Sequence, residues 1–171
     1  MFINEQINIE NLPKTDAIQY IKVEKSYFYI LLFNLIAIYS SLIVGITLFT
    51  FLIYKGVFQK FYWLFFAILI FALVVQIIFC KMGFSKRKYA IRDKDITYSE
   101  GLITNTTTTL PFNRVQHIEI KRSFLSRKLN LSTLNIYSAG ESGGDLSIKG
   151  LPKDVAEKMY TFLTNILNER L

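Results

Sequence analysis

Two long stretches without a charged residue, near the N-terminus, most constrain what this chain can fold into. The first covers residues 26–54 and the second covers residues 61–80. A hydrocarbon core about 30 Å thick is crossed by ~20 helical residues, and both stretches reach that length. Neither shows the charged face of a helix on the surface of a soluble protein. The sequence therefore predicts a hairpin of two transmembrane spans, at about residues 27–54 and 61–80.

Two other interpretations of these stretches fit the sequence less well. A helical hairpin buried in a soluble core would need two helices that are apolar on every face, which a soluble domain of this size rarely contains. A cleaved signal peptide has a shorter apolar segment, followed by a small-residue cleavage site that is missing here. We therefore expect an integral membrane protein.

Positive charges beside the predicted spans indicate how the hairpin is oriented. Two spans place both chain ends on one side, and Lys and Arg close to the spans are enriched on the cytoplasmic side. Six such residues lie on the side of the chain ends and two lie in the connecting loop: Lys22, Lys25, Lys81, Lys86, Arg87 and Lys88, against Lys55 and Lys60. We expect a multi-pass protein of the cell (inner) membrane with both termini cytoplasmic.

The composition changes abruptly at Lys81, where the apolar hairpin is followed by a polar and charged sequence. We expect three parts: an N-terminal cytoplasmic segment (1–25), the transmembrane hairpin (26–80) and a cytoplasmic domain (81–171). The last part is small but long enough to fold alone.

Alternation of apolar and polar residues recurs through the C-terminal part, as in β-strands with one buried face. Alternating segments lie around residues 89–92, 96–99, 102–110, 118–120, 134–137 and 146–148, and a helical turn is expected within residues 123–130. Turn-forming residues separate them, including the glycine-rich stretch 139–144. Short strands at this spacing predict an antiparallel β-sheet or barrel of six to seven strands.

Near the C-terminus the pattern changes from the period of a strand to that of a helix. Val155, Met159, Phe162 and Ile166 follow at spacings of 4, 3 and 4, which places them on one helix face, and Ala156 and Leu163 widen that face. Pro152 stands near the start, where its missing N–H is harmless. The sequence predicts a C-terminal amphipathic α-helix packed on the sheet, and thus an α+β membrane protein.

The order of these elements and several motifs resemble the YdbS-like bacterial membrane proteins, which carry a pleckstrin-homology-like (PH-like) domain. The matching stretches are Tyr89-Ala-Ile-Arg-Asp, Glu100-Gly-Leu-Ile, Leu110-Pro-Phe-Asn-Arg-Val-Gln-His-Ile, the segment from Phe124 to Gly140, and Ile148-Lys-Gly-Leu. The family usually has glycine where Asn130 stands, and asparagine also tolerates a left-handed backbone. The resemblance implies a PH-like fold after the hairpin and a bacterial cell membrane as the location.

Templates for catalysis and metal binding fail on composition and spacing. With one His and one Cys, a zinc site made of these residues cannot be completed. Asp93-Lys-Asp95 lacks the later glycine and acid of a calcium loop, and no Gly-Lys-Ser/Thr follows the glycines of residues 140–144. We therefore expect no catalytic residue, no metal, no cofactor and no enzymatic activity.

Two groups of basic residues are the candidate contacts to anionic lipid or to a partner. The first basic group is Lys81, Lys86, Arg87 and Lys88, and the second basic group is Lys121, Arg122, Arg127 and Lys128. Each charge near a membrane surface contributes ~1 kcal/mol of attraction to anionic lipid. The alternative for the second group is an ordinary solvated edge. From Tyr89 onward acids and bases nearly balance, so nucleic acid is not an expected partner.

These features predict a non-enzymatic, membrane-anchored PH-like binding or scaffolding module at the inner leaflet. The expected partners are the lipid bilayer, through its anionic headgroups, and a membrane protein. The resemblance implies a complex with a related, larger PH-like-domain protein, and a homo-oligomer is the other possibility. The alternative function is a small oligomeric pore or transport subunit, lined by Asn34, Ser40, Ser41, Thr47 and Gln76. Asn34, Ser41 and Thr47 spread around a helical wheel at 100° per residue, which weakens the alternative.

Overall fold

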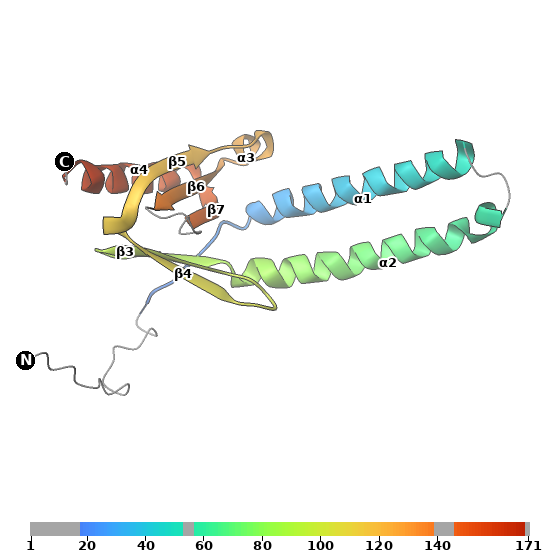
Figure 1. Cartoon of the computed structure of the whole chain (residues 1–171), viewed down its shortest axis with the longest axis horizontal. Coiled ribbons are helices and arrows are strands. Elements are labelled where there is room, and N and C mark those ends of the chain that lie inside the picture. The colour runs from blue at the N-terminus through green and yellow to red at the C-terminus, as the bar shows by residue number, and fades with distance from the viewer. Residues whose placement is uncertain (1–17, 53–56, 139–145, 170–171) are drawn as a thin grey trace, which may run out of the picture.

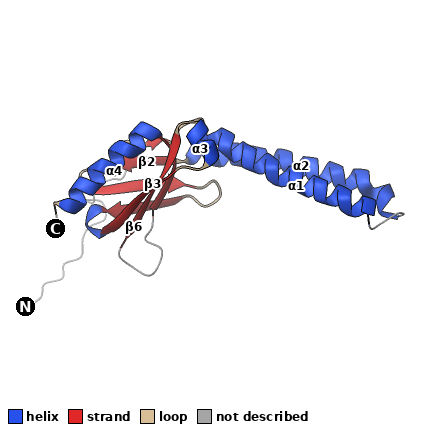
Figure 2. Ribbon diagram, turned by 90° about the horizontal axis from the view of Figure 1, so that it is seen from above, coloured by secondary structure: helices blue, strands red, loops and turns tan. Residues whose placement is uncertain are grey.

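In the computed structural model, which describes residues 18–52, 57–138 and 146–169, two long helices extend from one end of a β-rich unit (Figure 1). Helix α1 covers Tyr27–Leu52 and helix α2 covers Val57–Lys86. The two helices lie side by side (Figure 2). Most of the expected N-terminal segment, the centre of the loop between the spans and the glycine-rich turn lie outside the described residues.

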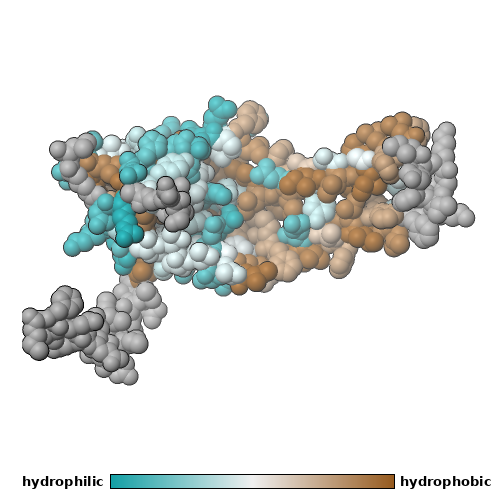
Figure 3. All heavy atoms as spheres, viewed as in Figure 1, coloured by the Kyte–Doolittle hydropathy of each residue, from teal (hydrophilic) through white to brown (hydrophobic). Residues whose placement is uncertain are grey.

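Both helices are long and apolar enough to cross a membrane. Large apolar side chains along them, such as Phe33, Phe51 and Phe71, are exposed within this chain. Figure 3 shows apolar surface over the helix pair and mostly polar surface over the β-rich unit. An apolar surface of this extent marks contact with lipid or another apolar partner, so the helices indicate membrane association.

Helix α2 continues through Lys86, beyond the predicted end of the span at Cys80. Lysine tolerates a helical backbone well, and no proline stands between these two positions. As a result Lys81 and Lys86 lie on the helix, where long side chains can extend toward lipid headgroups while their stems cover apolar surface.

Polar side chains within the helix pair find hydrogen-bond partners inside it. The Tyr39 hydroxyl donates to Gln76 Oε1 at 2.7 Å, which joins α1 to α2. The hydroxyls of Thr47 and Tyr62 lie 3.0 Å apart and form a second bridge between the helices. Ser40 donates to the carbonyl of Ile36 in its own helix. These contacts hold the hairpin together within an apolar environment.

Among the described residues, seven strands form two antiparallel sheets. The first sheet contains β1 (Ile21–Lys22), β2 (Lys88–Ile91), β3 (Asp95–Glu100) and β4 (Thr106–Pro111). The second contains β5 (Val115–Lys121), β6 (Leu131–Ser138) and β7 (Leu146–Pro152). Short helices η3 (Phe112–Arg114) and α3 (Phe124–Lys128) precede and follow β5, and α4 (Lys153–Asn168) is the C-terminal helix. The predicted α+β fold, with a helical hairpin followed by antiparallel strands and a C-terminal helix, is confirmed.

Strand β1 comes from the segment before the first helix and was not predicted. Ile21 pairs with Tyr89 and Lys22 pairs with Lys88, so β1 extends the first sheet at the edge of β2. Val23, the next residue, is buried in the core. A segment on the far side of the hairpin in sequence therefore belongs to the β-rich unit.

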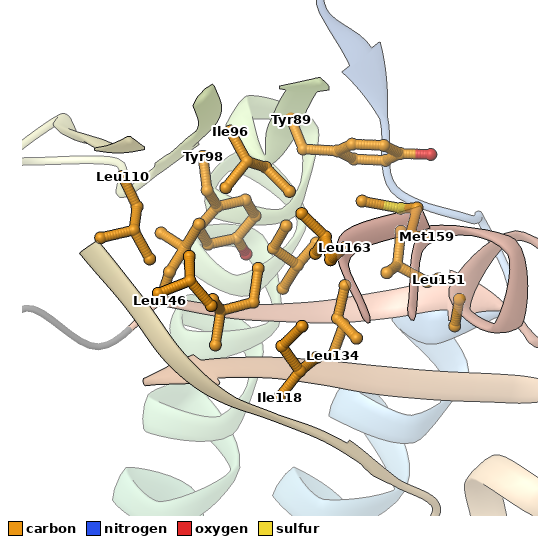
Figure 4. Close-up of a cluster of buried hydrophobic side chains, with 14 of the residues drawn as sticks. Tyr89, Ile96, Tyr98, Leu110, Ile118, Leu134, Leu146, Leu151, Met159 and Leu163 are labelled. Atoms are coloured by element: carbon orange, nitrogen blue, oxygen red, sulfur yellow. The ribbon is translucent and has the colours of Figure 1, made fainter. Parts of the chain in front are cut away.

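The core lies between the two sheets and is closed by α4 (Figure 4). Ile96, Tyr98 and Leu110 approach from the first sheet, and Ile118, Leu134 and Leu146 approach from the second. Helix α4 contributes mainly Ala156, Met159 and Leu163. The interior is apolar, as a small independent unit requires.

The predicted buried face of α4 was partly wrong. Phe162 was expected in the core stripe, but it is 43% exposed and its ring meets the edge of Phe112 at a centroid distance of 5.9 Å. Leu163, one position later, is 1% exposed. The helix is rotated so that Val155 and Ile166 flank the buried face.

The predicted strand over residues 102–110 begins only at Thr106. Gly101 has φ of +111°, and a Cβ there would lie 2.0 Å from the Thr104 carbonyl oxygen. The chain therefore turns at residues 101–105, which we call the β3–β4 tip. The Ser99 hydroxyl donates to Asn105 Oδ1 at 3.0 Å and closes this turn. Asn130 adopts the expected left-handed backbone, with φ of 52°.

Candidate functional site

The first basic group lies where α2 passes into β2. Lys81 and Lys86 are exposed on the last turns of α2. The Lys88 ammonium lies 4.0 Å from the centre of the Tyr20 ring, a cation–π contact with the segment before β1. Lys81 and Lys86 are thus the members of this group whose charges are open to a headgroup.

Arg87, by contrast, is built into the junction between the helices and the sheet. Its side chain is 22% exposed, and its Nε lies 3.7 Å from a carboxylate oxygen of Glu100. The guanidinium carbon lies 5.6 Å from the centre of the Tyr27 ring at the start of α1. Among the described residues, Arg87 Nη1 is buried without a hydrogen-bond partner. Arg87 therefore links α1, the end of α2 and β3.

Tyr98 completes this junction from β3. Its hydroxyl donates to Glu100 Oε2 at 3.2 Å. Burial raises the pKa of the Tyr98 phenol, and the nearby Glu100 carboxylate raises it further. The phenol therefore keeps its proton at neutral pH and remains a donor to Glu100.

Half of the second basic group is also engaged within the fold. Lys121 Nζ lies 3.0 Å from a carboxylate oxygen of Glu119, and Arg122 Nε donates to the Leu131 carbonyl at 3.2 Å. The hydrogen bond from Lys121 lowers the pKa of the Glu119 carboxyl, and the same bond raises the pKa of Lys121. The Lys121 pair lies within β5, and the Arg122 contact joins the end of β5 to the start of β6.

The other half of the second group, Arg127 and Lys128, is exposed on α3. Ser123 caps this short helix by accepting from the Ser126 N–H at 3.2 Å. Phe124 is 63% exposed, and Lys128 Nζ lies 4.8 Å from the centre of its ring. Helix α3 lies against α1, at the end of the β-rich unit from which the helices extend (Figures 1 and 2).

The structure therefore divides the eight candidate residues into two sets. Arg87, Lys88 and Arg122 are half-buried beside their partners, and Lys121 is exposed but paired with Glu119. Lys128 contacts the Phe124 ring of its own short helix and stays exposed. The exposed basic set is Lys81, Lys86, Arg127 and Lys128, on α2 and α3. Both of these helices lie at the end of the β-rich unit that adjoins the hairpin.

The sequence reasoning did not assign a role to Leu102 and Ile103 in the β3–β4 tip. Ile103 is 89% exposed, and a Cβ added at Gly83 of α2 would lie 3.7 Å from Leu102 Cβ. The tip thus lies beside the last turns of α2 (Figure 1). Two adjacent large apolar residues after a glycine turn were the available signal, because turns are usually polar.

The isolated His and the short acidic motif have structural roles. The His117 ring stacks on the Tyr137 ring, with 5.6 Å between the ring centres. Asp95 accepts two hydrogen bonds from Arg92, each at 2.6 Å, and so closes the β2–β3 turn. Within residues 18–52, 57–138 and 146–169, no group of three or more His, Cys, Asp and Glu could hold a metal.

The fold and this basic end define a PH-like unit carried on a membrane-associated helix pair. Residues 27–167 match the family model of the bacterial PH domain, and the chain belongs to this family. The match begins with α1 and ends in α4, so the helix pair is part of the family pattern. Comparison with curated proteins and with solved structures gives no match. The family indicates a binding module.

Proposed function

We propose that this chain is a non-enzymatic, membrane-anchored binding module that holds its PH-like unit against the anionic inner leaflet of a bacterial cell membrane. One observation carries the proposal: the exposed basic set lies on α2 and α3, at the end of the unit that adjoins the hairpin. Lys and Arg at that level are attracted to anionic headgroups. The helices would span the bilayer and leave both termini in the cytoplasm.

The partner in this proposal is a membrane protein beside the hairpin. The narrower resemblance to YdbS-like proteins supports a complex with a larger protein that carries related PH-like domains. The other form of the complex is a homo-oligomer of this chain. The PH-like unit would act as the scaffold, since its sheets and α4 form a complete core.

The pore alternative is less well supported by the contacts of its supposed lining. Gln76 accepts a hydrogen bond from Tyr39, and Thr47 pairs with Tyr62, so both side chains serve the contact between α1 and α2. Ser40 is bonded to its own helix backbone. Side chains engaged in this way are poor candidates for coordinating a passing ion or solute.

The proposed topology predicts that a thiol at residue 56 reacts with an impermeant maleimide from outside the cell. In a Cys80→Ser background, Gly56→Cys should be labelled in intact bacteria, because the loop between two spans faces outward. Lys158→Cys, exposed on α4, should be labelled only after the membrane is permeabilised. Labelling of Lys158→Cys in intact cells would contradict the topology.

The proposed contact of α3 predicts that its surroundings depend on lipid charge. A polarity-sensitive dye on Phe124→Cys, in the same Cys80→Ser background, should shift to the blue in nanodiscs that contain phosphatidylglycerol but not in pure phosphatidylcholine. The shift should shrink with salt, because the Debye length falls from ~10 Å at 0.1 M to ~3 Å at 1 M. Replacing Arg127 and Lys128 by glutamine should remove most of it.

The matched control neutralises two exposed lysines that are not on α2 or α3. Lys94 lies at the end of β3 opposite the β3–β4 tip, and Lys158 lies on α4. Lys94→Gln with Lys158→Gln should leave the dye response unchanged. An equal response in neutral and anionic nanodiscs would show that α3 does not meet the leaflet through charge.

A further inference from the structure

An open, groove-like cavity of about 590 Å³ lies between the helix pair and the β3–β4 tip. Tyr39 of α1, Ala72, Gln76 and Phe79 of α2, and the tip residues Leu102 and Ile103 are among its lining. The lining is mainly apolar, and its Tyr39 hydroxyl is already bonded to Gln76. The cavity therefore suits an apolar chain and offers little to a polar solute.

The cavity is held open by rigid parts of the fold. The tip is fixed by the left-handed Gly101 and by the hydrogen bonds from Ser99 to Asn105 and from Thr107 to Ser99. Leu102 of the tip lies against Gly83 of α2, where an added Cβ would be in ordinary contact with Leu102 Cβ at 3.7 Å. Figure 3 shows apolar surface at the place where Figure 1 draws the tip, next to the apolar surface of the helices.

One face of α2 joins this cavity to a positive charge. Ala72, Phe79 and Lys86 are seven residues apart, so they lie close to one line along the helix. Lys86 is exposed at the end of α2. From Gln76 to Lys86 the helix rises ~15 Å, which is comparable to the length of an acyl chain below its phosphate.

We propose that this cavity is a binding site for one phospholipid of the bilayer, with an acyl chain between α2 and the β3–β4 tip and its phosphate at Lys86. The proposal rests on the proposed function in one respect, namely that α1 and α2 span the membrane. With α1 and α2 in the bilayer, lipid is the medium that surrounds this open cavity. The apolar lining matches an acyl chain and the Lys86 ammonium matches a phosphate. A bound lipid would clamp the tip to the helices and set the tilt of the PH-like unit on the leaflet.

Native mass spectrometry of the full chain in mild detergent, supplemented with phosphatidylglycerol, tests this site. The wild type should retain one phospholipid per chain. Ala72→Trp, which places a large ring in the path of an acyl chain through the cavity, should lower the retained fraction at least tenfold. Val74→Trp is the matched control, because Val74 is exposed about 200° around α2 from Ala72, and it should retain lipid as the wild type does.

Lys86→Gln tests the headgroup part of the site. It should lower retention of phosphatidylglycerol more than retention of phosphatidylcholine. Equal lipid retention by Ala72→Trp and Val74→Trp would overturn the site. A wild type that is detected as a dimer without bound lipid would also overturn it, and would indicate a second copy of the chain as the occupant of the cavity. Maleimide labelling at Gly56→Cys and Lys158→Cys separates the two proposals. A wrong topology would change that labelling pattern, regardless of how many lipids the protein retains.

Discussion

Replacing Leu163 by aspartate is expected to abolish the cooperative unfolding transition of the PH-like unit. Leu163 is 1% exposed and packs in the core between the sheets and α4. Loss of its packing costs ~2–5 kcal/mol, and burial of an unpaired carboxylate adds several more. A small domain has only ~5–15 kcal/mol of stability, so the variant should be unfolded. Near-ultraviolet circular dichroism of the full chain in detergent, during heating, measures the transition.

The neighbouring substitution Phe162→Asp is the matched control. Phe162 is 43% exposed, and its ring packs edge-to-face on Phe112. Loss of that ring pair costs ~0.5–1.5 kcal/mol, so the variant should stay folded with a slightly lower melting temperature. If Phe162→Asp unfolded the unit and Leu163→Asp did not, the stripe read directly from the sequence spacing would be the buried one.

This pair of residues shows how far the helical period could be used. The spacing correctly located an amphipathic helix, and the predicted face, with its widening residues, contains the three buried ones, Ala156, Met159 and Leu163. Only its centre was placed too close to Phe162. Whether Phe162 or Leu163 faces the core depends on the rotation of α4 about its own axis as it packs on β5 and β6. The sequence of the helix alone does not determine this rotation. A period of 3.6 residues therefore predicts a helix better than it predicts the centre of its buried face.

The helices and most strands were predictable because their patterns are local. The absence of charge over two long stretches predicted α1 and α2, and alternation predicted most of the strands after them. Strand β1 was missed because two residues, Ile21 and Lys22, are too few to show a period. It forms only because β2, brought back by the hairpin, offers a free edge.

The candidate site was predictable in composition but not in detail. All eight basic residues could be found from clustering, yet nothing local distinguishes Lys86 from Arg87. The difference comes from partners that are distant in sequence, since Glu100 of β3 and Tyr27 of α1 meet Arg87 only in the fold. The proposed role of Ile103 in lining the lipid site could be inferred only from the fold, which places the β3–β4 tip beside α2.

Gly150→Ala is expected to lower the melting temperature by about 10 °C and to loosen α1 from β7. Gly150 has φ of +79°, where a Cβ is strained by ~1–3 kcal/mol. That Cβ would also lie 2.6 Å from Cγ of Tyr27 and 2.7 Å from its Cβ. These atoms lie close to the Tyr27 backbone, so the ring cannot turn away unless the start of α1 moves. Thermal unfolding in detergent measures the loss.

A double-mutant cycle with Tyr27→Gly separates the clash from the backbone strain, because both the ring and the Cβ of Tyr27 lie within 3 Å of the added Cβ. Without the Tyr27 side chain, Gly150→Ala should cost only the strain, so its effect should be clearly smaller than in the wild type. Equal costs in both backgrounds would mean that Tyr27 does not seat α1 on β7. Gly45→Ala is the control within α1, since a Cβ there meets nothing within 4 Å and alanine favours the helix.

The same junction connects stability to the proposed function. The Glu24 N–H donates to the Gly150 carbonyl at 2.9 Å, and Arg87 lies over the Tyr27 ring, so three segments meet at this glycine. If α1 is displaced there, α3, which lies against α1, should lose its fixed height above the leaflet. Gly150→Ala should therefore also reduce the blue shift of the dye at Phe124→Cys in anionic nanodiscs, while Gly45→Ala should preserve it.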